Sequence, residues 1–158
     1  MKLKTLVAVV LFILCGANVA QAQKACTQMW CQEGTTVNLK SDTWPPGNYE
    51  FVITADDRTV TCKSSLPFKA CEGNTTCNGE GVLIGESGCA LPPEAHSFHA
   101  IMLPAIPEKI KIVVTHESGK TFSYQTPIEK SCFFPNGKGC DPKPCCSAVQ
   151  DLTLDWKE

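Results

Sequence analysis

The cysteines are the residues with the most scope for chemistry, because the 158-residue chain contains eleven of them. Thiolates ligate zinc, exchange disulfides or form structural bridges, and their spacing separates these roles. Apart from one adjacent pair, the nearest cysteines are separated by four or five residues: Cys26 and Cys31, Cys71 and Cys77, Cys140 and Cys145. A zinc site or a thioredoxin-like centre would use C-x-x-C pairs, so we predict structural disulfides.

The expected bridges involve ten of the eleven cysteines: Cys26, Cys31, Cys62, Cys71, Cys77, Cys89, Cys132, Cys140, Cys145 and Cys146. Closeness in sequence predicts three pairs: Cys26 with Cys31, Cys71 with Cys77, and Cys62 with Cys89. The other four would then fasten a C-terminal loop among themselves. Cys145 and Cys146 are not expected to bond to each other, because neighbouring residues rarely reach relaxed disulfide geometry.

The three histidines do not predict a metal site. His96 and His99 are three residues apart, so a strand from Ser97 to Leu103 would place them on opposite faces. His116 ends a strand on its apolar side, where we expect a partly buried ring satisfied by hydrogen bonds. We therefore predict no metal.

Motifs for nucleophilic catalysis and phosphate binding are missing from the sequence, which contains neither a G-x-S-x-G elbow nor a glycine-rich phosphate loop. Asp56 and Asp57 are interpreted as turn formers, because aspartate side chains bond to nearby backbone amides. We predict no catalytic residue and no cofactor.

A short hydrophobic segment begins the chain and predicts export. Residues 1–22 combine a Lys2 and Lys4 head, an apolar run and an Ala20-Gln21-Ala22 cleavage pattern, which together are typical of a secretory signal peptide. Cleavage would leave residues 23–158 as a single domain without a membrane anchor, in the periplasm or outside the cell. Cys15 does not indicate a lipoprotein, because Leu14 stands where a small residue is needed.

The charge balance argues against nucleic acid and anionic membranes as partners. Without Lys2 and Lys4, 12 basic residues face 16 acidic ones, and no basic cluster occurs along the chain. Binding to nucleic acid depends on concentrated positive charge.

Alternation with a period of two dominates the mature chain and predicts strands. Tyr49, Phe51 and Ile53 share one face of a strand that forms a hairpin with the following β-branched run. Residues 109–116 alternate lysine with isoleucine and valine, and a glycine turn leads into residues 121–124. We also expect strands at 35–39, 82–85, 98–103 and 151–156.

This pattern predicts an all-β fold, an antiparallel, immunoglobulin-like β-sandwich stapled by disulfides, with a small β-barrel as the alternative. Residues 71–81 and 133–147 contain many turn formers and are expected to be irregular, cross-linked loops.

Two aromatic residues in the second loop, Phe133 and Phe134, are candidates for partner contact, and Trp30 or Trp44 could serve in the same way. We favour a different role for them, as a cover folded back over the edge of the sandwich. Asn74 begins an Asn-Thr-Thr sequon in the first loop, a glycosylation signal only in a eukaryotic source.

The layout resembles a group of small exported bacterial proteins of uncharacterised role. The likeness rests on three segments: Pro45-Pro46-Gly47-Asn48-Tyr49, the Ser-Gly-Cys-Ala-Leu-Pro run at 87–92, and a loop of the type Pro-Asn-Gly-x-x-Cys-x-Pro-x-Cys at 135–145, in which Lys143 occupies the gap before Pro144. The resemblance implies a bacterial periplasm and carries no activity to this chain.

The expected function is that of an exported, non-enzymatic binding or accessory protein of the cell envelope, acting on another envelope or extracellular protein. One alternative is a secreted inhibitor that inserts a stapled loop into a cleft. The other is a small enzyme whose site is assembled from distant loops.

Overall fold

A computed structural model describes residues 24–156 of the chain. The predicted signal peptide 1–22 and the expected N-terminal residue Gln23 lie outside the described residues, as do residues 157–158. Within the described range, no helix has the length and hydropathy needed to cross a membrane.

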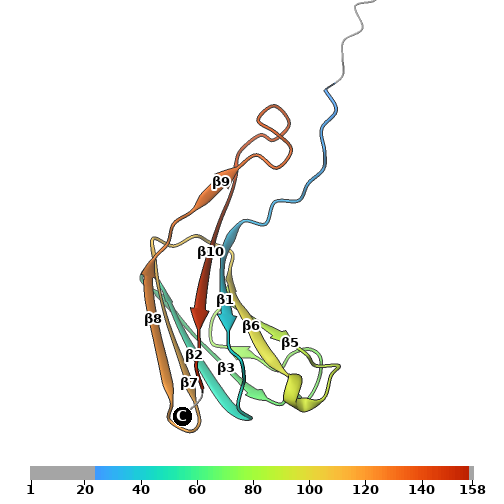
Figure 1. The fold of residues 1–158 in the computed structure, drawn as a ribbon. Helices are drawn as coiled ribbons and strands as arrows, with labels where there is room; N and C mark the ends of the chain where they lie inside the picture. The colour runs from blue at the N-terminus through green and yellow to red at the C-terminus, as the bar shows by residue number, and fades with distance from the viewer. Residues whose placement is uncertain (1–23, 157–158) are drawn as a thin grey trace, which may run out of the picture.

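Two five-stranded sheets pack face to face and confirm the predicted β-sandwich over the small barrel (Figure 1). The first sheet has the order β5-β6-β1-β10-β9, and the second has the order β4-β3-β2-β7-β8. In the described part, the strands and one short 3-10 turn run β1 (Gly34–Lys40), β2 (Gly47–Ala55), β3 (Arg58–Leu66), β4 (Thr76–Cys77), β5 (Leu83–Ser87), η1 (Pro93–Ala95), β6 (Ser97–Leu103), β7 (Lys109–His116), β8 (Thr121–Pro127), β9 (Ser131–Phe133) and β10 (Cys145–Thr153).

The core lies between the sheets and follows the predicted alternation. Tyr49, Phe51 and Ile53 of β2 are all buried, and the isoleucines and valine of β7 pack beside them. Trp44 joins this core through edge-to-face contact with Phe98, at 5.2 Å between ring centroids.

One strand pair departs from the predicted antiparallel pattern. β1 and β10 run parallel, in a register from Gly34 opposite Ser147 to Lys40 opposite Thr153. A disulfide bonds Cys31, which precedes β1, to Cys145, the first residue of β10. Both strands therefore start from the same end of the sandwich.

Strands extend into both loops that were expected to be irregular: β4 lies within residues 71–81, and β9 ends and β10 begins within residues 133–147. Cys77 of β4 pairs with Cys62 of β3, and Cys132 of β9 pairs with Cys146 of β10. Disulfides join both pairs, with Cα atoms 4.0 and 4.1 Å apart, respectively. The last strand accordingly begins at Cys145, six residues before the predicted start at residue 151.

All ten of the cysteines named above form disulfides, but the predicted pairings Cys26–Cys31, Cys71–Cys77 and Cys62–Cys89 are wrong. Cys140 and Cys145 also bond outside the C-terminal loop. The observed bridges are Cys26–Cys140, Cys31–Cys145, Cys62–Cys77, Cys71–Cys89 and Cys132–Cys146. Strand pairing and the contact between the chain's two ends decide the partners, whereas closeness in sequence does not.

Candidate functional site

Two segments from opposite ends of the described chain form a cross-linked projection, which we call the stapled head: residues 24–33 and 131–146. β9 and the loop that follows it extend beyond the rest of the sandwich (Figure 1). Two bridges, Cys26–Cys140 and Cys31–Cys145, each span a sequence separation of 114 residues and join the two segments. The two segments of the stapled head are thus cross-linked to each other, and they continue into β1 and β10 of the sandwich.

The side chain of Asn136 is the polar centre of the stapled head. Its Oδ1 accepts hydrogen bonds from the Met29 backbone N–H at 2.6 Å and from the Thr27 hydroxyl at 2.8 Å. Its Nδ2 donates to the Met29 carbonyl at 3.2 Å and to Asp141 Oδ1 at 2.8 Å. One amide therefore pairs with both polar backbone groups of Met29, as a neighbouring strand would.

The local sequence explains how Asn136 reaches that position. Gly137 N–H donates to the Phe134 carbonyl at 3.0 Å, which closes a turn with Pro135 and Asn136 in the middle. Gly137 has a φ of 90°, which glycine adopts without the clash that a Cβ atom causes. Asp141 closes the loop from the other side, accepting the Asn136 backbone N–H at 2.7 Å.

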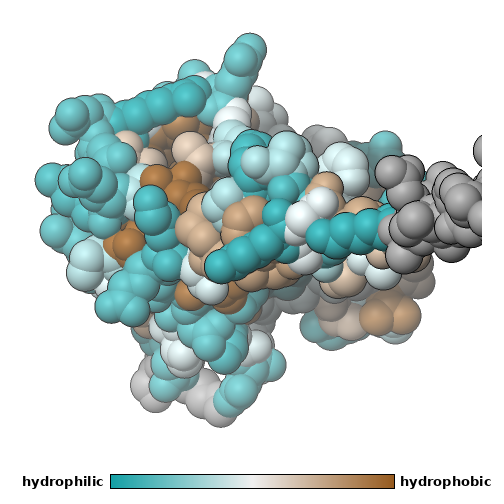
Figure 2. Space-filling model, turned by 90° about the horizontal axis from the view of Figure 1, so that it is seen from above, coloured by the Kyte–Doolittle hydropathy of each residue, from teal (hydrophilic) through white to brown (hydrophobic). Residues whose placement is uncertain are grey.

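Large apolar side chains on this rigid frame are open to solvent. Trp30 is 89% exposed, Met29 58% and Phe133 50%. Phe133 lies opposite Cys145 in the β9–β10 pair, and Trp30 directly precedes Cys31, so both aromatic residues adjoin the same Cys31–Cys145 bridge. Hydrophobic groups also lie between hydrophilic ones on the face seen from above (Figure 2).

A hollow of about 440 Å³ separates the two segments of the stapled head. Its walls are mainly apolar and include Met29, Trp30, Pro135, Pro142 and Pro144. On its rim, Lys143 and Glu33 form an ion pair with 3.0 Å between Nζ and Oε1. Apolar walls with a few fixed polar groups are typical of recognition sites.

The structure changes the expectation for the aromatic candidates. Phe133 and Trp30 do not fold back over the sandwich, because both are strongly exposed, while Phe134 is half-buried. Trp44 is partly buried and packs against the core, with its ring beside Tyr49. No role was predicted from the sequence for Met29 or Asn136, although the Pro-Asn-Gly motif at 135–137 predicts a turn there.

The buried histidines use their ring nitrogens within the fold. His96 Nδ1 accepts the Phe68 N–H at 2.9 Å, so its Nε2 carries the proton that bonds to the Leu91 carbonyl at 3.1 Å. His116 bonds to the Pro46 carbonyl through Nε2 and to Ser118 through Nδ1. His99 is exposed, on the face opposite the core.

Asn74 has a structural task that competes with glycosylation. Its Nδ2 donates to the Ala70 carbonyl at 2.7 Å and to Glu86 Oε2 at 2.8 Å, and its Oδ1 accepts from the Lys69 and Ala70 backbone. The amide nitrogen that would carry a glycan is therefore occupied in the fold.

A larger groove, of about 700 Å³, runs over the outer face of the first sheet. Leu83, Met102, Thr36 and Val149 lie in one row across its four strands. No disulfide joins the four residues of this row, whereas two disulfides fix the exposed aromatic residues of the stapled head, so we favour the stapled head as the site.

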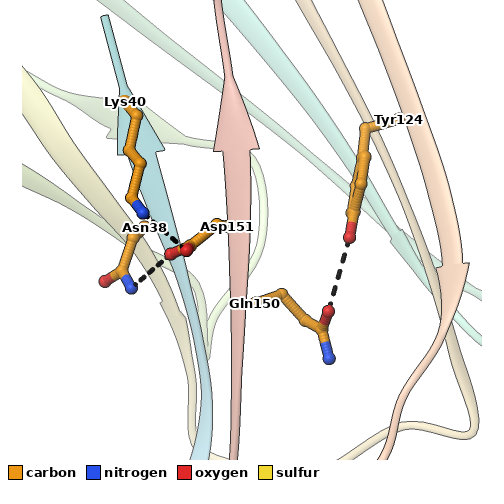
Figure 3. A network of polar contacts seen from close by, with 5 residues as sticks. All are labelled: Asn38, Lys40, Tyr124, Gln150 and Asp151. Atoms are coloured by element: carbon orange, nitrogen blue, oxygen red, sulfur yellow. Dashed lines mark hydrogen bonds and ion pairs between the residues drawn. The ribbon is translucent and has the colours of Figure 1, made fainter.

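Next to that groove, a polar network fastens the parallel strands (Figure 3). Asp151 of β10 accepts from Lys40 Nζ at 2.6 Å and from Asn38 Nδ2 at 2.9 Å, both on β1. The hydrogen bond from Lys40 lowers the pKa of Asp151, and the bond from Asn38 adds to this effect. Gln150 points the other way and accepts from the Tyr124 hydroxyl on β8 in the second sheet, at 3.4 Å.

Comparison of the chain with protein-family models, with curated proteins and with solved structures found no match. Its own geometry is therefore the basis on which a function can be assigned.

Proposed function

We propose that this chain is an exported, non-enzymatic binding protein of the cell envelope, and that its stapled head contacts another envelope or extracellular protein. The observation that carries the proposal is the exposure of Trp30, at 89%, on a segment that two disulfides and Asn136 hold in place. Five disulfides support an oxidising environment for the folded protein.

Rigidity supports binding, because association costs free energy whenever a loop or side chain must be ordered. The ordering cost is about 0.5–1.5 kcal/mol for each flexible side chain that is immobilised. In the stapled head, Cys31 and Asn136 fix the backbone on both sides of Trp30, so much of this cost is met during folding.

Residue type also supports the proposal. Tryptophan is among the residues that contribute most to protein interfaces, and methionine and phenylalanine are enriched at interface centres. Trp30 and Met29 adjoin the apolar hollow, and the Glu33–Lys143 ion pair forms part of its polar rim. An apolar centre with a polar rim is the usual arrangement of a protein–protein interface.

The inhibitor hypothesis is a narrower form of the same proposal. It is favoured by the way the stapled loop extends beyond the sandwich (Figure 1), which would let it enter a cleft. Activity assays of a captured partner would distinguish the two forms, since only an inhibitor would abolish the partner's activity at one-to-one stoichiometry.

The experiment is site-specific photo-crosslinking in an envelope extract of the producing organism, with a crosslinking residue placed at position 30 or, as a control, at position 149. Val149 is also exposed and apolar, at 62%, but lies on β10 in the outer groove. We expect one saturable protein adduct from position 30 and none from position 149.

A substitution completes the test. Trp30→Ala should weaken binding of the captured protein at least tenfold, as loss of a central tryptophan costs about 2 kcal/mol or more at interfaces. Val149→Ala should leave binding unchanged. Equal adducts from both positions, or an unchanged affinity for Trp30→Ala, would show that the stapled head is not the contact surface.

A further inference from the structure

The outer strands of the two sheets differ in how well they are protected against pairing with another chain. Natural proteins protect edge strands by making them short, bulged or charged. β4 has two residues and β9 has three, and β5 carries both Glu86 and a bulge between Gly85 and Glu86. Three of the four edges in the described sandwich are therefore poor templates for a further strand.

The fourth edge, β8, has none of these devices along its length. It has seven residues, none of them charged, and pairs with β7 from Thr115–Thr121 to Lys109–Pro127 without a register shift. Its proline, Pro127, stands only at the final position. β8 runs the full height of the sandwich, and none of the other strands in residues 24–156 pairs with its outer side (Figure 1).

The hydrogen bonds of the β7–β8 hairpin show which backbone groups face outward. His116 N–H donates to the Lys120 carbonyl and Ile128 N–H to the Glu108 carbonyl, so the even-numbered residues of β8 face β7. The N–H and carbonyl groups of Thr121, Ser123 and Gln125 therefore point to the free edge.

The even-numbered side chains on the inner face of β8 are aromatic. Phe122 and Tyr124 are half-buried and pack against the margin of the core. A strand added to β8 would bring its own side chains alongside them, so apolar residues at alternate positions would suit this place.

We propose that the occupant is β8 of a second copy of this chain, paired antiparallel about a twofold axis at Ser123. In that register, Phe122 lies opposite Tyr124 of the second copy, and Tyr124 lies opposite its Phe122. Ser123 lies opposite Ser123 of the second copy, and Thr121 of each copy lies opposite Gln125 of the other. These three pairs exchange backbone hydrogen bonds.

Self-complementarity is the reason for choosing a second copy over a strand from another protein. The twofold axis creates two aromatic cross-strand pairs at once, and no residue from Thr121 to Pro127 brings a charge against its counterpart. The second sheets of both copies would join into one continuous sheet. Because the pairing is antiparallel, the stapled heads would lie at opposite ends of the dimer.

The test measures the mass of the oxidised mature protein in solution across a wide concentration range, for the wild type and for four variants. Ser123→Lys and Ser123→Glu each place like charges opposite one another at the axis and should weaken the dimer by about fivefold or more. An equimolar mixture of the two should recover it as a heterodimer. Val149→Lys adds the same charge on the other sheet and should dimerise like the wild type.

Recovery in the mixture excludes misfolding as the cause of dissociation, because only folded variants can pair. A wild type that stays monomeric at every concentration, a dimer that persists in both Ser123 variants, a mixture that stays monomeric, or growth beyond two copies would each overturn the proposal. Trp30→Ala should dimerise normally, so failure of the β8 pairing is distinguishable from failure of the stapled-head contact.

Discussion

The side-chain amide of Asn136 pairs with both the N–H and the carbonyl of Met29, a residue 107 positions earlier in the chain. The amide thus makes the two hydrogen bonds that the backbone of a neighbouring strand would make to Met29. It fixes the segment that presents Trp30, and it makes Asn136 a positioning residue for the proposed contact surface.

Removing this amide should loosen the N-terminal segment while the sandwich stays intact. Asn136→Ala deletes three hydrogen bonds that join the two segments of the stapled head, each worth about 0.5–1.5 kcal/mol. We expect hydrogen exchange at the Met29 amide to accelerate at least tenfold and the thermal midpoint to fall by several degrees. The sandwich should still fold, because the disulfides still join the segments.

Lys138→Ala, in the same loop, is the matched control and should leave exchange at Met29 unchanged. If the Met29 amide exchanged at the wild-type rate in Asn136→Ala, the disulfides alone would hold the segment. Asn136 would then have no positioning role.

The two bridges of the stapled head should stabilise the fold non-additively. Cys26–Cys140 and Cys31–Cys145 close nearly the same long loop of the unfolded chain, so whichever bridge remains keeps the ends together. In the chain-entropy model, closing a loop of this length stabilises the fold by about 5 kcal/mol. When one bridge is already present, the other closes only the short ring between the two bridges and adds about 3 kcal/mol.

Replacing either cysteine pair by serines should therefore lower the free energy of unfolding by about 3 kcal/mol, and replacing both should lower it by about 8 kcal/mol. Denaturant unfolding of the three variants measures this difference. Strictly additive losses would show that the bridges act on the native state and not through closure of the unfolded chain.

The strands that the sequence predicted best are those with one buried and one exposed face. Residues 109–116 alternate so regularly that β7 was predicted with its observed bounds. The start of β10 was missed because Cys145 and Cys146 follow prolines and show no alternation of their own. Their strand geometry comes from pairing with β9, which no local pattern reveals.

The disulfide partners depend on contacts that span the whole chain. Cys26 lies five residues from Cys31 in sequence, yet each bonds to a cysteine 114 residues away. The parallel pairing of β1 with β10 brings these distant segments together, and parallel pairing was not expected in this fold. The candidate site was likewise only half predictable, since Phe133 and Trp30 were named from the sequence but their exposure depends on the stapled head.

The pH dependence of the β1–β10 pair is the third prediction, and it follows from the lowered pKa of Asp151. The bond from Lys40 is the main cause, and Asn38 adds to it. A carboxyl group whose pKa is lower in the folded state stabilises the fold above its unfolded-state pKa, about 3.9. That contribution is lost as pH falls through the lower, folded-state value.

We therefore expect the difference in unfolding free energy between the wild type and Asp151→Asn to stay constant from neutral pH to about pH 5, and to shrink below about pH 4. The effect should be small and weaken with added salt, because Asp151 and Lys40 are both exposed to solvent. NMR titration of the Asp151 carboxyl group measures the cause directly. Lys40→Met removes the main hydrogen bond and should raise the pKa of Asp151 towards its ordinary value, whereas an unchanged pKa in that variant would show that Lys40 does not set it.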